Sequence, residues 1–467
     1  MKTSQRRLAF RSVPFEPARL PFFYGWIVMG IGTLGMVMSA PGQTVGVSVF
    51  TDPLIEAHGL SRSLLSLAYL IGTLSSAMIL SYAGRLYDRH GARIVATIAA
   101  SGLALTLVYL SFSVEIADAV RGVFGFVPPA IVAFVVMALG FFMLRFTGQG
   151  VLTLASRNMV MEWFEARRGL ANAFMGIAVA FGFSYAPRVF EAFVSANSWN
   201  VAWRLIAVAV GVFAVIALIM YRDTPEAHGL RPDGGDVRLK REPHPESRPA
   251  RAFTAAQARR TYSFWIFTLS LFVGSVVGTA YTFHIVSIFA DAGMSRTQAV
   301  GIFFPASMVA ISVQFLGSWL SDRMKLRYLC TVQLLGILVL LAGLMVLRAG
   351  APVIMLIAGQ GLMQGMFGIT SNITWPRFFG RRHLGAITGM VQALTVAGSA
   401  VGPYLYSFGR DLTGSYFVAS AFFAVIAFVL LIGSFWAERP EHPEPEHLEP
   451  EEPAEPVETA PEHRPDA

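Results

Sequence analysis

Twelve apolar runs, each long enough to cross a lipid bilayer, constrain this chain more than any other feature of its sequence. A transmembrane helix needs about 20 mostly apolar residues, because the bilayer core is about 30 Å thick and a helix rises about 1.5 Å per residue. The chain is 54% hydrophobic and only 14% charged, whereas a soluble domain has about 25% charged residues. The sequence therefore predicts an all-α membrane protein with twelve transmembrane helices. The predicted spans are residues 24–50, 63–84, 93–112, 130–156, 169–195, 203–221, 263–289, 298–320, 328–347, 352–375, 385–407 and 415–436.

A polar segment at residues 222–262 separates the first six spans from the last six, which predicts two six-helix bundles at 23–221 and 263–436. The segment is rich in Pro, Gly and alternating charges, and we interpret it as a cytoplasmic linker. Residues 1–22 form a basic amino-terminal tail. Residues 437–467 hold 11 acidic residues and 2 arginines among many prolines, and we expect this tail to be disordered.

The positively charged residues lie almost entirely in one set of loops. With the amino terminus taken as cytoplasmic, 28 of the 36 Lys and Arg residues fall on that side, 6 fall in the opposite loops, and Arg145 and Arg188 fall within spans. Cytoplasmic loops are enriched in Lys and Arg. We therefore expect a multi-pass protein of the plasma membrane with both termini in the cytoplasm, and the bacterial inner membrane is the favoured location.

The sequence contains none of the common catalytic or nucleotide-binding motifs. It has no H-E-x-x-H, no Walker loop, no G-x-S-x-G and no Cys/His spacing typical of a metal site. We predict that the protein is not an enzyme and needs no cofactor or metal, and its basic loops require no nucleic acid to explain them. Without a nucleotide-binding segment, any transport would have to use a gradient rather than ATP.

The two halves of the chain repeat each other in the same direction. Residues 84–93 have a looser copy at residues 318–327. Parallel repeats of six spans place a substrate site at the interface of the two bundles, near the middle of the membrane. Three positions of the fifth span also match the eleventh at a constant offset of 216 residues: Gly182, Ala186 and Pro187 match Gly398, Gly402 and Pro403.

The repeated loop carries a carboxylate in each half. A carboxylate at this position can face the positive amino-terminal end of a neighbouring helix, and such contacts would break when the bundles move apart. We interpret the loops as a conformational latch, with a surface salt-bridge cluster as the alternative. The latch residues are Gly84, Asp88, Arg89, Gly91 and Arg93 in the first copy, and Asp322 and Arg323 in the second.

Ionisable side chains inside the predicted spans are candidates for substrate binding or ion coupling, because a charge at membrane depth is costly. Arg145 can bind an anion or cap carbonyl groups at a helix break. Arg188 and Glu191 share a helix face at i, i+3 spacing and can pair, although Arg188 can also snorkel to the interface. Glu191 and His284 are the candidates for proton coupling, with a local hydrogen bond as the alternative for His284.

Polar residues at irregular points of the spans form a second group of candidates. The sequence Pro41-Gly42-Gln43-Thr44 interrupts the first span, and irregular backbone at membrane depth survives only where it is buried or lines a cavity. The alternative is a helix kink without substrate contact. The other substrate or coupling candidates of this group are Gln149, Gln360, Asn372 and Trp375.

Several of these motifs resemble those of the major facilitator superfamily of secondary transporters. The loop at 84–93 matches its pattern G-x-L-x-D-R-x-G-x-R, and Arg145 to Gly150 resembles its fourth-span motif R-x-x-Q-G with one residue inserted. The resemblance implies a fold of two six-helix bundles. It also implies that Asp88 faces the span that begins near Gly385, and that Asp322 faces the span that begins near Gly169.

Two further patterns are similar to the monocarboxylate-porter and oxalate:formate-antiporter branch of that superfamily, namely Tyr24-Gly25-Trp26 and Trp163-Phe164-x3-Arg168-Gly169. That branch places a cationic residue in the first span and an arginine in the eighth. The corresponding regions of this chain read Pro41-Gly42-Gln43 and Ile311-Ser312-Val313-Gln314, without charge. An anion would then have to bind Arg145 or Arg188.

We therefore predict a secondary active transporter that works by alternating access and carries a small, monocarboxylate-like organic anion with a proton. Its partners would be the lipid bilayer, the small-molecule substrate and a proton or counter-substrate gradient, and we expect a monomer. An exporter of amphipathic drugs or metabolites is the alternative, favoured by 37 Phe and 19 Met residues. A non-transporting membrane sensor that signals through the acidic tail is the third possibility.

Overall fold

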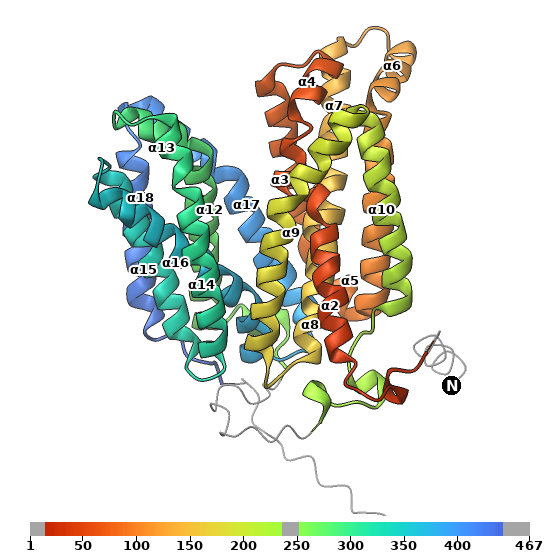
Figure 1. Ribbon diagram of the computed structural model, residues 1–467, viewed down its shortest axis with the longest axis vertical. Helices are drawn as coiled ribbons and strands as arrows, with labels where there is room; N and C mark the ends of the chain where they lie inside the picture. Colours follow the sequence, from red (N-terminus) through yellow and green to blue (C-terminus); the bar gives the residue numbers. More distant parts are fainter. Residues whose placement is uncertain (1–14, 236–251, 442–467) are drawn as a thin grey trace, which may run out of the picture.

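The computed structural model describes residues 15–235 and 252–441, and its helices form two groups that stand side by side (Figure 1). Most of the predicted acidic tail, part of the linker and most of the amino-terminal tail lie outside these residues. The amino-terminal half contains α2 (Gly25–Met38), α3 (Thr44–Ser48), α4 (Thr51–His58), α5 (Arg62–Ser111), α6 (Ser113–Val123), α7 (Pro129–Leu144), the π-helical segment η3 (Arg145–Leu152), α8 (Thr153–Trp163), α9 (Arg168–Ala196) and α10 (Trp199–Met220). The carboxy-terminal half contains α12 (Tyr262–Asp291), α13 (Arg296–Gly301), α14 (Phe303–Ser321), α15 (Leu326–Met345), α16 (Ala351–Phe379), α17 (Leu384–Thr413) and α18 (Phe417–Ser434). The short elements are η1 (Pro17–Arg19), η2 (Ala40–Gly42), η4 (Glu226–His228), η5 (Pro232–Gly234) and α11 (Ala255–Ala258).

Eleven helical stretches of the described residues are long and apolar enough to cross a membrane. One of them lies in the 50-residue helix α5, which would be about 75 Å long if it were straight, more than twice the thickness of the bilayer core. Gly91 interrupts α5 with non-helical dihedral angles, φ 82° and ψ 170°, and divides it into two arms that each suffice for one span. The structure therefore confirms the predicted architecture of twelve transmembrane helices.

Two predicted spans follow a different course in the structure. The first span breaks after Met38, where the 3-10 turn η2 precedes the short helix α3. The prediction that the fourth span ends at residue 156 is wrong, because α8 continues to Trp163. Its last turns are buried, so that the polar side chains of Arg157, Asn158 and Glu162 contact protein rather than water. A helix whose end is buried by other parts of the protein can contain charged residues that a hydropathy pattern assigns to a loop.

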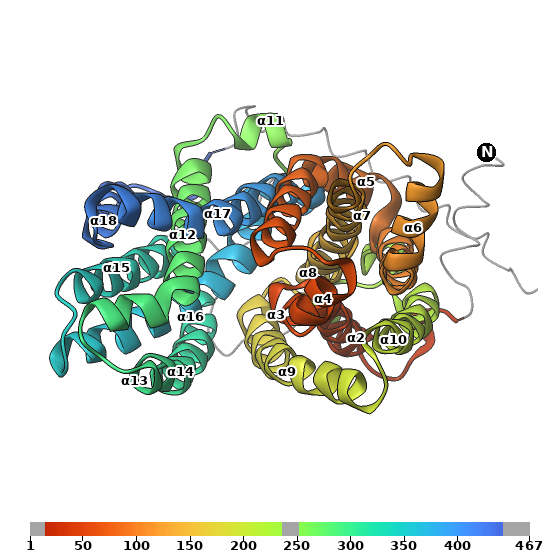
Figure 2. The same ribbon diagram turned by 90° about the horizontal axis from the view of Figure 1, so that it is seen from above.

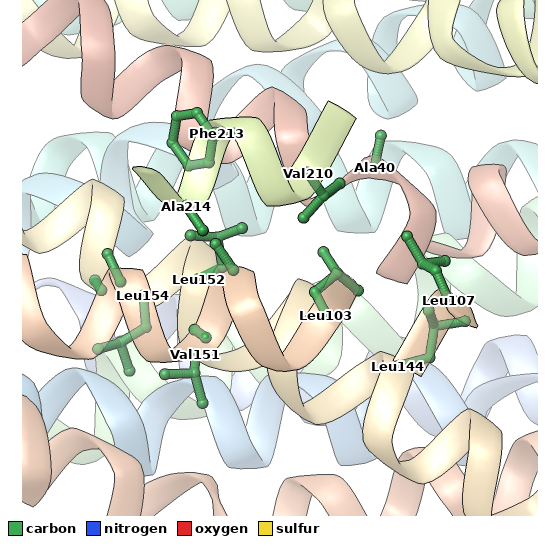
Figure 3. Packing of buried hydrophobic residues seen from close by; sticks show 14 of the residues in the cluster. Ala40, Leu103, Leu107, Leu144, Val151, Leu152, Leu154, Val210, Phe213 and Ala214 are labelled. Carbon is green, nitrogen blue, oxygen red and sulfur yellow. The ribbon is translucent and has the colours of Figure 1, made fainter. Parts of the chain in front are cut away.

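Each half buries its own apolar core. Figure 3 shows part of the first core, where Leu103 and Leu107 of α5 pack near Leu144 of α7 and Val210 of α10. Figure 2 shows the two groups of helices from above, with α17 beside α5 and α9 beside α14 along the line where the halves meet. Because the cores are separate, one half can move against the other without unpacking either of them.

Glycines allow some helices to approach until their backbones touch. A Cβ atom at Gly336 of α15 would lie 2.7 Å from the amide nitrogen of Met363, and one at Gly359 of α16 would overlap the backbone of Leu340. Helices in membranes associate closely through such small residues. These glycines therefore set the spacing of α15 and α16.

The contact of Gly359 can be tested by a single methyl group. We expect Gly359→Ala to cost about 1–3 kcal/mol, because the added atom meets backbone that cannot rotate away. The matched control is Gly30→Ala in α2, since a Cβ at Gly30 meets no atom within 4 Å. Thermal unfolding in detergent should show a lower midpoint for Gly359→Ala and an unchanged or higher midpoint for Gly30→Ala. Equal shifts of the two variants would contradict this packing.

Candidate functional site

A cavity of about 340 Å³ lies between the two halves, bordered by α2, α8 and α9 on one side and by α14, α16 and α17 on the other. This is the position that the internal repeat predicts for a substrate site. Its apolar lining includes Met36, Met175 and Phe367. The polar side chains that line it are Thr153, Arg157, Gln314, Gln364, Ser371, Asn372, Gln392 and Thr395.

Arg157 is the only charged residue among the described residues that line this cavity. Its side chain is 6% exposed and donates one long hydrogen bond, 3.4 Å, to the amide oxygen of Gln392 in α17. Its Nε has no hydrogen-bond partner among the described residues. Sequence analysis missed this residue because it counted Arg157 as part of a basic loop. A buried guanidinium with unused donors can bind an anion.

Asn372 lines the cavity from α16, and of the ten substrate or coupling candidates it is the only one that does. It donates to the side-chain oxygen of Asn172 in α9 at 2.6 Å and accepts from Ser371 at 3.1 Å. Gln43 does not line the cavity but contacts a residue that does. Its amide donates to Ser39 and, at 3.4 Å, to the cavity-lining Thr153. Thr44 lies within 3.0 Å of the Tyr69 hydroxyl.

Arg145 is buried and does not line the cavity. It binds the backbone where the first span is broken. It donates to the carbonyl oxygen of Gly42 at 3.0 Å, and its guanidinium lies 5.3 Å from the centre of the Tyr69 ring. These contacts correspond to the capping alternative of the sequence analysis. Gln149, in the same π-helical segment, brings its backbone against Gly42, because a Cβ at Gly42 would lie 2.9 Å from the Gln149 amide nitrogen.

The other candidates also lie away from the cavity. Arg188 and Glu191 are exposed on α9, and among the described residues Glu191 accepts a hydrogen bond from Ser195 and forms no ion pair with Arg188. His284 is bound within its own half by Pro403, Ser407 and Tyr416. Gln360 is buried in α16, and Trp375 is buried in an aromatic cluster with Phe264 and Phe379.

The cavity is closed at the end that carries the repeated loops. We call this end the basic face and define it by residues 85–93, 163–168, 222–235, 322–327 and 377–384; it is the lower end in Figure 1. Asp88 accepts hydrogen bonds from the amides of Gly385 and Ala386, at 2.6 and 2.8 Å, at the start of α17. The backbones of α5 and α17 touch here, since a Cβ at Gly84 would overlap the carbonyl oxygen of Gly385.

Asp322 makes the equivalent contact at the start of α9. Its carboxylate accepts from the amide of Gly169 at 3.1 Å and lies 3.4 Å from the Arg377 guanidinium. Burial raises the pKa of Asp322 from 3.8 to about 6, although Arg377 and the Gly169 amide lower it in part. Both carboxylates thus lie at the helix ends that the resemblance implies, where the helix dipole favours negative charge.

The remaining residues of the two loops position the backbone around these carboxylates. Gly91 has a positive φ and leaves no room for a side chain beside Asp223. Arg93 is buried and donates to the carbonyl oxygen of Leu218. Arg323 lies 3.9 Å from the centre of the Trp319 ring, and Arg89 is exposed.

The linker also takes part in closing the basic face, which sequence analysis did not predict. Arg381 of the carboxy-terminal half donates to the backbone oxygen of Glu162 at 2.7 Å and pairs with the linker residue Glu226 at 2.6 Å. Asp233, with φ 58°, accepts from the three consecutive amides of residues 165–167. The sequence Pro232-Asp233-Gly234 predicts a turn, but no local signal shows which backbone the turn would bind.

The hydrogen bonds that join the two halves in the described part of the chain lie in and next to this face. Besides the latch contacts, Asn158 donates to Thr388 at 2.7 Å, and Asn172 donates to Ser318 at 3.0 Å. The conformation is therefore closed at the basic face.

Comparison with known proteins assigns the family. A model of the Major Facilitator Superfamily matches residues 32–403. The chain belongs to this superfamily. The chain is also similar in fold to several solved structures. One is a transporter, FucP, in the outward conformation (TM-score 0.63, 14% identity, 89% of this chain and 100% of that chain). Another is the human organic anion transporter MFSD10 (TM-score 0.60, 15% identity, 88% of this chain and 100% of that chain). The proton:xylose symporter XylE is a third (TM-score 0.57, 16% identity, 89% of this chain and 94% of that chain). No curated protein sequence matches the chain.

This superfamily member should close its basic face more firmly at low pH. If opening returns Asp322 to water, its pKa falls back towards 3.8, so closing takes up a proton. At pH 5 the closed state then gains about tenfold in population relative to pH 7.5. Distances between spin labels at His90 and Tyr328, measured in a Cys330→Ser background, report the opening. Burial also raises the pKa of Asp88 from 3.8 to about 6, so the Asp322→Asn variant should lose this tenfold contribution and keep the one from Asp88. Opening of the face on acidification would contradict the prediction.

Asp88→Asn should slow turnover without weakening substrate binding. The carboxylate accepts two amide hydrogen bonds through two oxygens, whereas an asparagine amide has one acceptor oxygen. We expect a severalfold lower maximal transport rate with KM changed by about twofold or less, because no cavity residue is altered. Asp118→Asn, an exposed acid on α6, is the control. A large rise in KM at an unchanged maximal rate would argue against a latch.

Proposed function

We propose that this member of the Major Facilitator Superfamily is a secondary active transporter of a small organic anion with a single carboxylate, which binds Arg157 in the central cavity. The observation that supports it most is the buried guanidinium of Arg157, which lines the cavity without any carboxylate among the described lining residues. A buried charge without a partner costs several kcal/mol in most proteins, about 3–5 where one partner of a pair is removed. A bound anion supplies the missing partner.

The size and polarity of the cavity agree with such a substrate. Its volume of about 340 Å³ lies at the small end of ligand pockets. Amide and hydroxyl groups from both halves surround the guanidinium, and they can bind the uncharged part of the substrate. A site shared by two rigid halves is what alternating access requires, because rocking of the halves then exposes the same site on either side.

The basic face is proposed to be cytoplasmic, since Lys and Arg gather on the cytoplasmic side of membrane proteins. The conformation described above is then closed to the cytoplasm. The sequence patterns that resemble the monocarboxylate-porter branch support the anion indirectly. Tyr24 packs 5.6 Å from Trp163, and Trp26 packs 5.3 Å from Phe164, so these patterns build one aromatic cluster near the basic face rather than the binding site.

A proton is the proposed coupling ion, and its binding sites lie outside the cavity lining. All three proteins named above are described as carriers of protons or organic anions: FucP and XylE as proton symporters and MFSD10 as an organic anion transporter. In this chain, Asp322 lies at a contact that forms and breaks with the conformational change. A carboxyl group that titrates there links proton uptake to closing.

Uptake into proteoliposomes tests the anion. Arg157→Gln should lose at least about 30-fold in substrate affinity, because removal of one partner of a buried charge pair costs about 2–5 kcal/mol. Arg157→Lys should retain part of it, since the lysine keeps the charge but not the planar fork. Arg188→Gln is the matched control, because Arg188 is exposed on α9 outside the cavity.

The screen should contain monocarboxylates, dicarboxylates and amphipathic cations at two pH values. Uptake of amphipathic cations that is insensitive to Arg157→Gln would favour a drug exporter instead. Deletion of residues 442–467 separates a transporter from a sensor, because a transporter should keep its flux without the tail. Unchanged anion uptake in Arg157→Gln would refute the proposed function.

A further inference from the structure

Gln314 is an uncharged polar side chain at the interface between the two halves. It lies in α14, four residues before Ser318, and lines the cavity from the carboxy-terminal half. The only charged group of the described lining, Arg157, comes from α8 in the opposite half. The cavity therefore offers one cation and, facing it across the interface, an amide.

Two glycines hold the Gln314 amide at the interface. A Cβ at Gly176 of α9 would overlap the Gln314 amide nitrogen, and a Cβ at Gly368 of α16 would lie 3.0 Å from it. Gly176 and Gly368 both line the cavity and belong to different halves. Any larger residue at either position would displace the amide. The side chain is thus fitted into a gap between the halves and presents a fixed hydrogen-bonding group to the cavity.

Neutral hydrogen-bonding groups outnumber the charge in this cavity. Six further uncharged polar side chains line it: Thr153, Gln364, Ser371, Asn372, Gln392 and Thr395. The cavity has a volume of about 340 Å³. A three-carbon acid would fill a minor part of that space and could bind few of these groups, whereas a six-carbon acid with several hydroxyls fits both the volume and the polarity.

We propose that the substrate is a polyhydroxylated monocarboxylate, that is, an acid of the sugar-acid class, and that Gln314 is a specificity-determining residue which binds its hydroxyl groups. This inference rests on the proposed anion transport and adds the chemistry of the rest of the substrate. Arg157 holds the carboxylate. Gln314 and the other amides bind hydroxyls, to which an amide can both donate and accept.

The same groups exclude two related classes of acid. An alkyl acid of equal length would leave Gln314 and the other half-buried amides of the site without partners once the halves enclose it, and a site built to bind hydroxyls strongly rejects an analogue that lacks them. A dicarboxylate would bring a second charge that finds no cation among the described lining residues. Selectivity thus follows from a cavity whose described lining residues include one cation and several amides.

Competition for binding to the full-length protein in detergent tests the substrate class with four probes of similar size. Gluconate has the carboxylate and the hydroxyls, hexanoate lacks the hydroxyls, glucose lacks the carboxylate, and glucarate has a second carboxylate. We expect gluconate to bind at least about tenfold more tightly than each of the other three, since one lost hydrogen bond in a buried site is worth about a factor of ten.

Two substitutions test the role of Gln314. Gln314→Met keeps the length of the side chain and removes its hydrogen bonds, so it should weaken gluconate about tenfold and leave hexanoate unchanged. Gln314→Arg adds a cation and should bring glucarate to or above the affinity of gluconate. Gln360→Met is the control, since Gln360 is a buried glutamine of α16 outside the cavity lining. Thermal unfolding checks that each variant is folded, and the wild-type competition stands even where a variant is not.

The outcomes separate this inference from the proposed function. If hexanoate competes as well as gluconate, or Gln314→Met weakens both equally, the substrate class is wrong while anion transport by Arg157 stands. If glucose competes as well as gluconate and Arg157→Gln binds gluconate normally, the proposed function fails and the inference fails with it. Preference for glucarate in the wild-type protein would overturn the assignment of a single cation.

Discussion

The contact between the Asp88 carboxylate and the first amides of α17 is the interaction on which the arrangement of the two halves depends. It uses groups that a helix leaves without partners at its amino-terminal end, so a single carboxylate binds two amides and the helix dipole at once. The approach needs glycine on both sides, at Gly84 and Gly385. Asp322 and Gly169 repeat the arrangement. Two such contacts, each between a loop of one half and a helix end of the other, close one end of the cavity without joining the cores.

This mode of closure suits a contact that must also open. The linker adds the Glu226–Arg381 ion pair, whose side chains are 50% and 25% exposed, and partly exposed pairs contribute about 1 kcal/mol or less. Asp233 binds three amides within its own half, so the linker stays attached there while its link to Arg381 breaks. The closed face is therefore held by several weak, separable contacts rather than by one apolar seam. The free-energy difference between open and closed states can then remain small enough for a substrate or a proton to shift it.

The fold was predictable to the extent that it follows from hydropathy and repetition. Twelve spans, two halves and the partners of Asp88 and Asp322 could all be inferred, because each depends on residue type and on a family pattern. The binding site could not be inferred in the same way. Arg157 looks like part of a basic loop because its sequence neighbours Asn158 and Glu162 are polar, and only burial by the opposite half makes α8 continuous there. The depth of Arg145 in the membrane suggests a site residue, yet its guanidinium donates to the carbonyl oxygen of Gly42 at the break in the first span. Tertiary contacts between segments far apart in sequence decide both cases.

Under the proposed function, the charge of Arg157 also explains why transport should need a bound substrate. In the present conformation the Arg157 side chain is 6% exposed and lines the cavity between the halves. Closing the cavity fully around an empty site would leave this positive charge without a counter-charge, which is costly in a low-dielectric interior. A bound carboxylate neutralises the guanidinium, so the occupied site can be enclosed at much lower cost. The same arginine that binds the anion would thereby raise the barrier for the empty transporter relative to the loaded one. Such a difference between loaded and empty states is what couples the movement of the two halves to the movement of substrate.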